Sequence, residues 1–151
     1  MRLAAIPGLN LQAISPWYRT APVPASDQPD YINGVVAAAG SVDPVLLLHA
    51  LHRIEAEAGR VRGAPNAARV LDLDLLAAGD LVRSGPGLVL PHPRMHERAF
   101  VLEPLCDVAP DWRHPVLGET AVALRDRLTG QRTERIPEDT QDLLLRSSAL
   151  T

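Results

Sequence analysis

Two aspartates within an apolar segment are the residues of this 151-residue sequence best suited to chemistry. They are Asp72 and Asp74, and leucines lie between and around them. Residues two apart in a strand share a face and lie about 6.5–7 Å apart, so both carboxylates would project together while the leucines pack behind them. Such a pair can hold two magnesium ions that clamp phosphate groups. The alternative is an exposed strand with a solvated polar face, although aspartate is disfavoured in strands and neighbouring like charges repel.

Three arginines, Arg60, Arg62 and Arg69, lie on or beside the polar loop that leads into this acidic pair. Phosphoryl transfer spreads negative charge over the transferred group, and the protein contributes mainly positioning and positive charge. Guanidinium groups suit phosphate oxygens, and a loop can bring them in late as a lid. Each arginine taken singly is typical of an ordinary surface, but their place directly before the acidic pair favours phosphate binding.

The segment from Pro91 to Phe100 combines two histidines, two arginines and an aromatic residue at an expected strand-to-helix junction. A helix N-terminus with basic side chains is a natural anion site. His92 and His96 are four residues apart, but the His-Glu-x-x-His pattern of zinc hydrolases is absent. The cluster therefore indicates either an anion site or histidines that serve only the surface and the core.

Tyr31 and Asn33 would share one face of a further strand. An aromatic ring can stack on a flat heterocycle, and an amide offers both a donor and an acceptor to the edge of that heterocycle. Taken alone, Tyr31 fits a core residue better than a binding residue, because buried aromatic side chains usually just pack.

The elements that must position these residues follow from hydrophobic periodicity and turn signals. Asp43 as N-cap, Pro44 at the first position and Gly59 at the far end delimit the clearest helix. A turn at Gly79-Asp80 should start a short hairpin, and the chain from Thr129 should be polar and frayed. Strands are expected over residues 9–19, 31–39 and 70–77, helices over 44–58, 94–108 and 119–128, loops over 20–29 and 60–69, and a last helical turn over 3–6. This order predicts an α+β domain, with an antiparallel sheet and helices on one face.

Composition narrows the class of protein. The net charge of −3 argues against a broad basic surface for nucleic acid. The single cysteine, Cys106, excludes an intrachain disulfide and favours a reducing, cytoplasmic location. No apolar run approaches the roughly 20 residues of a membrane helix. We therefore expect a cytoplasmic protein without a nucleic-acid or membrane partner.

The chain resembles the hydroxymethyldihydropterin pyrophosphokinases in the order and spacing of its motifs. These motifs are Trp17–Pro22, Asp27–Asn33, Ile54-Glu55 with Gly59–Arg62, Arg69–Leu76, and Leu90–Pro93 with Arg98–Phe100. Asp-Gln-Pro-Asp-Tyr-x-Asn and Arg-x-x-Asp-Leu-Asp rarely occur together, which makes the resemblance specific. It covers the chain from about Leu3 to Leu128, and so predicts a domain over residues 1–128 and a polar tail over 129–151.

The resemblance implies a ferredoxin-like α+β fold and an activity. Members of this family transfer diphosphate from ATP to 6-hydroxymethyl-7,8-dihydropterin in folate biosynthesis, giving AMP and the pterin diphosphate without a covalent intermediate. It also implies two magnesium ions as cofactor and a monomer whose partners are these two small molecules. Two other classes of protein are alternatives: a catalytically dead pterin- or nucleotide-binding descendant of the enzyme, and a ferredoxin-like RNA-binding module. The last is disfavoured because aromatic residues are only 3% of the sequence and the net charge is negative.

The family's functional residues carry over to the matching positions here. The resemblance implies that the magnesium ligands are Asp72 and Asp74 and that the catalytic-loop arginines are Arg60 and Arg69. The implied ATP-binding residues are His52, Glu55, Arg62, Leu75, His92 and Arg98. The implied pterin-binding residues are Thr20, Ala21, Val23, Tyr31, Asn33 and Phe100, with the two rings sandwiching the heterocycle.

The sequence departs from the family pattern in two places. The family begins with a strand ending in a Gly-Ser-Asn turn and then a helix, of which only the helix end is expected here. We therefore expect the 151-residue chain to be unstable or prone to aggregate and to show little activity. An extended form, preceded by that strand and helix, should melt cooperatively and turn over. In the loop, residues 65–67 and Val70 replace the family's common residues, which bears on how the loop closes.

Overall fold

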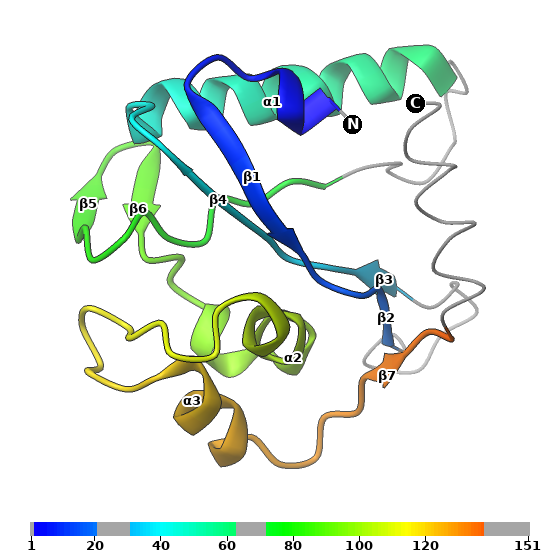
Figure 1. The fold of residues 1–151 in the computed structure, drawn as a ribbon, viewed down its shortest axis with the longest axis vertical. Coiled ribbons are helices and arrows are strands. Elements are labelled where there is room, and N and C mark those ends of the chain that lie inside the picture. The colour runs from blue at the N-terminus through cyan, green and yellow to red at the C-terminus, as the bar shows by residue number, and fades with distance from the viewer. Residues whose placement is uncertain (1, 21–30, 63–71, 138–151) are drawn as a thin grey trace.

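The computed structural model describes residues 2–20, 31–62 and 72–137, without the side chains of residues 2 and 59–62. Its elements are η1 (Arg2–Ala5), β1 (Leu9–Ile14), β2 (Tyr18–Thr20), β3 (Tyr31–Asn33), β4 (Val36–Gly40), α1 (Pro44–Arg62), β5 (Arg83–Gly85), β6 (Leu88–Leu90), η2 (Met95–Glu97), α2 (Ala99–Val108), α3 (Ala121–Arg127) and β7 (Glu134–Arg135). Every strand pair among them is antiparallel, which confirms the α+β class. In Figure 1, α1 runs along one side of the molecule and α2 and α3 lie on the other, with β1 and β4 crossing between them. No helix in these described ranges has the length and apolar character needed to cross a membrane.

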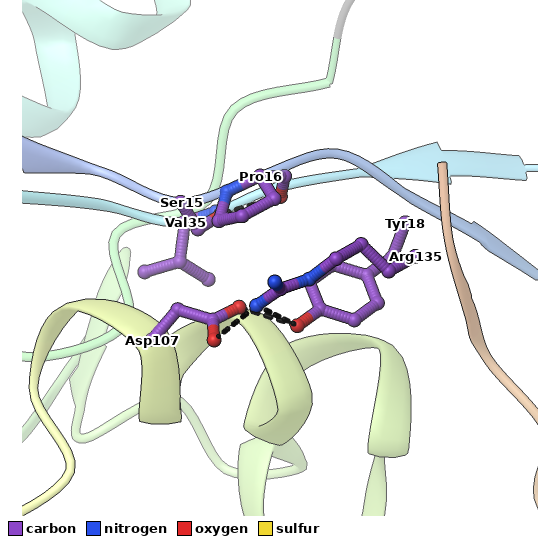
Figure 2. A network of polar contacts seen from close by, with 6 residues as sticks. All are labelled: Ser15, Pro16, Tyr18, Val35, Asp107 and Arg135. Atoms are coloured by element: carbon purple, nitrogen blue, oxygen red, sulfur yellow. Dashed lines mark hydrogen bonds and ion pairs between the residues drawn. The ribbon is translucent and has the colours of Figure 1, made fainter. Parts of the chain in front are cut away.

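The strands predicted over residues 9–19 and 31–39 are each broken in the middle. The described strands form three small sheets, in the orders β1-β4, β3-β2-β7 and β5-β6. At the break, the Ser15 amide donates to the Val35 carbonyl at 2.9 Å, and the Val35 amide donates to the Ser15 hydroxyl at 2.9 Å (Figure 2). The side chain of Ser15 thus takes a bond that a ladder would have used, and Pro16 has no amide hydrogen to continue the ladder.

Helix α1 begins as predicted and ends later than predicted. Asp43 caps it, because its Oδ1 accepts a hydrogen bond from the Val45 amide at 2.8 Å. The predicted end at Gly59 is wrong, since the helix continues to Arg62. A glycine inside a helix costs only about 1 kcal/mol relative to alanine. The helix can continue past Gly59 because arginine, which follows it, is a good helix former. Arg60 and Arg62 therefore lie in the last turn of α1 rather than in a loop.

Residues 72–78 do not form a strand, which corrects the described part of the strand predicted over 70–77. A strand is defined by ladder bonds to a neighbour. Here the Leu73 amide donates to the Glu55 carboxylate at 2.8 Å, and the Leu76 carbonyl accepts from the His92 amide at 2.7 Å. The segment is held by one side chain of α1 and by the turn after β6. The predicted turn at residues 79–80 is present, but the β5–β6 hairpin that follows makes its own turn at residues 86–87.

The main core lies between α2 and α3 and includes the short helix η2. Its buried side chains are Met95, Val101, Leu102, Leu105, Ala121 and Leu124. Thr120 caps α3 by accepting from the Ala123 amide at 3.2 Å. The helix predicted over 94–108 is divided, because Arg98 adopts an extended conformation between η2 and α2. Gln131 bridges this break through hydrogen bonds to Ala99 and Glu97, a contact from a distant part of the chain.

The described part of the segment after Thr129 is ordered, so the prediction of fraying is wrong there. Strand β7 pairs with β2, and Ile136 is buried with its amide donating to the Trp17 carbonyl at 3.0 Å. The predicted division into a domain and a tail remains a prediction, since residues 138–151 lie outside the described ranges.

A buried histidine makes the stability of this fold depend on pH. The ring of His114 accepts hydrogen bonds at Nδ1 from the amides of Val116 at 3.2 Å and Leu117 at 3.1 Å. It stands edge-on to the rings of Trp112 and His96. Burial, and then the nearby His96, lower the pKa of His114 from its ordinary 6.5. The unfolded state therefore binds more protons as the pH falls below 6.5, and the free energy of unfolding decreases.

We expect His114→Asn to reduce this pH dependence, because its amide oxygen can replace Nδ1 as acceptor but cannot titrate. Denaturant unfolding at about pH 7 and about pH 5 should show a smaller loss of stability in the variant than in the wild type. An equal loss in both proteins would contradict the assignment to His114.

Candidate active site

The acidic segment, residues 72–76, presents its aspartates to solvent. Asp72 and Asp74 are exposed, whereas Leu73 and Leu75 are half-buried. The predicted alternation therefore holds although no ladder is present. Glu55 fixes the segment at one end and His92 at the other. Of the predicted ATP-binding residues, Glu55, Leu75 and His92 thus lie on or in contact with this segment.

His92 lies where the acidic segment meets the basic residues that follow β6. Burial contributes most to lowering the pKa of His92, Asp74 raises it, and Arg98 and Arg94 lower it further. All three charged groups are therefore close enough to act on the imidazole, which favours its neutral form. The Arg94 amide donates to His92 Nδ1 at 3.2 Å, so the ring proton is assigned to Nε2. The structure brings a carboxylate, a neutral imidazole and two guanidinium groups together.

Arg98, whose charge acts on His92, also stands beside a predicted pterin residue. Its guanidinium carbon lies 5.4 Å from the ring centre of Phe100, within cation–π range. Phe100 is half-buried and packs against the α2–α3 core, which fixes the position of its ring. A predicted ATP residue and a predicted pterin residue are therefore neighbours at the start of α2.

The remaining described pterin candidates lie on β2 and β3, which pack against α2. Thr20 is opposite Tyr31 in the strand pair, and Asn33 is opposite Tyr18. Tyr31 is 52% exposed, which argues against a role confined to the core. The hydroxyl of Thr20 is buried and has no hydrogen-bond partner among the described residues. Strand β3 carries both an aromatic ring, that of Tyr31, and a side-chain amide, that of Asn33, as predicted.

Several predicted site residues are not placed by the structure. Arg69, Ala21, Val23 and the departures at 65–67 and Val70 lie outside the described residues. The backbone of Arg60 and Arg62 belongs to α1, but their side chains are not described. His52 is exposed on α1, about one turn before Glu55.

The predicted cluster from Pro91 to Phe100 separates into two groups. His92 belongs with the acidic segment, whereas the ring of His96 lies 6.0 Å from that of His114. The first amide of α2, that of Ala99, donates to Gln131 at 2.9 Å. This amide is therefore already used, and among the described residues Arg94 and Arg98 supply positive charge near His92. Sequence reasoning counted Arg94 among the basic side chains of this cluster but assigned it no individual role.

The donor set suits magnesium shared with a substrate. Among the described residues, no three His, Cys, Asp or Glu side chains converge to hold a metal ion. Magnesium is usually bound by one or two carboxylates together with substrate phosphates and water. Asp72 and Asp74 supply two exposed carboxylates on a fixed backbone, so the residues present fit such an ion.

Comparison with known proteins decides the family. Residues 2–110 match the family described as 7,8-dihydro-6-hydroxymethylpterin-pyrophosphokinase (HPPK). The chain belongs to this family. The matched range includes the acidic segment, His92, Arg98 and both strands of the β2–β3 pair.

Relatives carry the corresponding name, 2-amino-4-hydroxy-6-hydroxymethyldihydropteridine pyrophosphokinase. The chain is 46% identical over 110 residues to the protein from Pseudomonas aeruginosa, covering 73% of the chain and 68% of that protein. It is 41% identical over 126 residues to the protein from Synechocystis, covering 83% of the chain and 64% of that protein. For the HPPK relative from Methylorubrum extorquens the identity is 41% over 134 residues, covering 89% of the chain and 84% of that protein. The chain thus spans about two thirds of the length of the first two relatives.

Proposed function

We propose that this chain transfers diphosphate from ATP to 6-hydroxymethyl-7,8-dihydropterin, giving AMP and the pterin diphosphate in folate biosynthesis. The observation that carries the proposal is the meeting of the acidic segment with Glu55 on one side and with His92 on the other. Membership of the HPPK family and the names of the relatives support it.

In this proposal the described residues divide the work on ATP. Asp72 and Asp74 would hold two magnesium ions, which when bound neutralise and orient the phosphates. His92, neutral and protonated at Nε2, can donate a hydrogen bond to a phosphate oxygen without adding charge. Arg98 adds a fixed positive charge, because its guanidinium is braced by Phe100. Glu55 acts at one remove, since its carboxylate holds the Leu73 amide between the two aspartates.

The pterin would bind beside this group. Tyr31 and Phe100 would enclose the ring system, Asn33 would read its polar edge, and Thr20, Ala21 and Val23 would contribute contacts from the adjoining backbone. The nucleophile is the pterin hydroxyl oxygen, which attacks the β-phosphorus of ATP. A P–O bond to the pterin forms as the bond to AMP breaks, and the hydroxyl proton leaves.

We extend the proposal to the remaining partners and the setting. The chain would act as a cytoplasmic monomer with ATP and the pterin as its small-molecule partners and without a nucleic-acid or membrane partner. Size-exclusion chromatography with light scattering tests the monomer, and a mass of twice that of the chain would contradict it.

Titration followed by an assay separates an enzyme from a dead binding protein. Calorimetric titration with the pterin and with a non-hydrolysable ATP analogue measures binding, and chromatography of the reaction mixture measures AMP. The protein should bind both ligands and release AMP only when the pterin and magnesium are present. Binding of both ligands without AMP release would instead support the catalytically dead descendant.

Glu55 provides a prediction about the acidic segment. We expect Glu55→Ala to lower turnover about tenfold at saturating ATP, because the backbone between the two aspartates loses its anchor. Glu55→Gln keeps an oxygen acceptor and should retain most of the activity. Equal losses in the two variants would show that the negative charge matters rather than the hydrogen bond to Leu73.

A further inference from the structure

The segment from Gln131 to Ile136 returns to the predicted pterin side of the molecule from beyond the family match, which ends at residue 110. At its start, Gln131 Oε1 accepts from the Ala99 amide at 2.9 Å, and Gln131 Nε2 donates to the Glu97 carbonyl at 2.8 Å. One side chain therefore fixes both sides of the break before α2. Phe100 is the next residue of that helix.

Near its end, the segment fastens β2 to α2 through Arg135. Arg135 Nη2 donates to Asp107 Oδ1 on α2 at 2.8 Å, and the Tyr18 hydroxyl donates to the other oxygen of the same carboxylate. The Arg135 guanidinium also stands 5.9 Å from the centre of the Tyr18 ring. Figure 2 shows the three side chains converging from β2, α2 and β7. Burial and then the bond to Asp107 raise the pKa of Tyr18, so the hydroxyl stays protonated as a donor at neutral pH.

These contacts meet the elements that carry the pterin candidates. Tyr18 is buried and lies opposite Asn33 in the strand pair, two residues before Thr20. Asp107 lies in the last turn of the helix whose first turn carries Phe100. The network thus sets the spacing between the β2–β3 pair and α2, which are the two walls that would face the heterocycle.

We propose that Gln131 and Arg135 are positioning residues for the pterin substrate, acting through Ala99, Asp107 and Tyr18. This inference rests on the proposed function, because it needs the pterin to bind between β3 and the start of α2. It differs from a simple contribution to stability. Exposed ion pairs usually add little to folding stability, so a selective effect on one ligand is the diagnostic outcome.

The test compares three alanine variants by calorimetric titration with the pterin and, separately, with a non-hydrolysable ATP analogue. Arg135→Ala and Gln131→Ala remove the two contacts. Arg127→Ala is the matched control, because it breaks an ion pair with Glu119 that involves no residue of β2 or α2. The variants are made in the full chain, and a thermal melt of each defines a temperature at which all are folded.

We expect Arg135→Ala to weaken pterin binding about fivefold and to leave binding of the ATP analogue unchanged. Gln131→Ala should weaken pterin binding by a similar factor and should also weaken the ATP analogue, because the break that Gln131 spans carries Arg98. Arg127→Ala should change neither dissociation constant. Arg135→Lys keeps a charge beside Asp107 and should recover part of the loss, and Tyr18→Phe should repeat the defect without removing an ion pair. Unchanged pterin binding in Arg135→Ala, or an equal weakening of both ligands in that variant, overturns the inference. A wild-type protein that binds neither ligand overturns the proposed function as well.

Discussion

Asp74→Ala is expected to reduce magnesium-dependent AMP release to background, and Asp72→Ala to do the same. Both carboxylates lie exposed on a segment whose backbone is held by Glu55 and His92. Without either carboxylate, a magnesium ion and the phosphates it carries would lose a ligand from the protein. Because the chemistry of phosphoryl transfer depends almost wholly on positioning and charge, the expected loss is on the order of a thousandfold or more.

The fold should survive both substitutions. Neither carboxylate is buried, so a thermal melt should stay close to that of the wild type. Asp80→Ala is the matched control, because Asp80 is exposed on the turn that follows the acidic segment. It should retain wild-type turnover. Wild-type rates in Asp72→Ala or Asp74→Ala would remove the metal assignment.

The second large effect is expected at the two arginines assigned to the catalytic loop. Arg60→Ala and Arg69→Ala should each lower kcat on the order of a hundredfold while changing the KM values far less. Their charges would matter most when the transferred group develops negative charge, and not when ATP first binds. Arg60 lies in the last turn of α1, the helix whose Glu55 holds the acidic segment.

Steady-state kinetics with both substrates varied checks this expectation. Arg53→Ala is the control, because Arg53 is exposed on the same helix about two turns earlier. It should leave kcat unchanged. If the arginine variants raise KM and keep kcat, the two residues bind substrate but do not assist the chemical step.

Local sequence signals predicted the elements that depend on near neighbours. Asp43 and Pro44 located the start of α1, because a cap acts within one turn of the helix. The exposure of Asp72 and Asp74 followed from alternation alone. The ladder around them did not form, since a strand needs a partner that periodicity does not supply. The break at Ser15 has a local signal in Pro16, but it also depends on a hydroxyl that bonds a residue 20 positions away.

In the candidate site, too, positions within motifs could be predicted and long-range contacts could not. The motif positions of Glu55, His92 and Arg98 could be predicted, and the structure brings all three to the acidic segment or its neighbours. The contacts of Gln131 and Arg135 could not, because they join residues 28 to 117 positions apart and carry no periodic signal. A polar stretch after a helix is typical of a frayed end. Only its hydrogen bonds to residues of α2 and β2 distinguish this segment from a frayed end.

The transferred group is identified by following the ATP phosphates. The protein is incubated with magnesium, the pterin and ATP labelled with radioactive phosphorus in both the β and γ positions, and the products are separated by chromatography. We expect both labels to move together into a pterin diphosphate and the nucleotide product to be unlabelled AMP, in equal amounts. Labelled ADP with a singly phosphorylated pterin, or label that never reaches the pterin, would contradict this expectation.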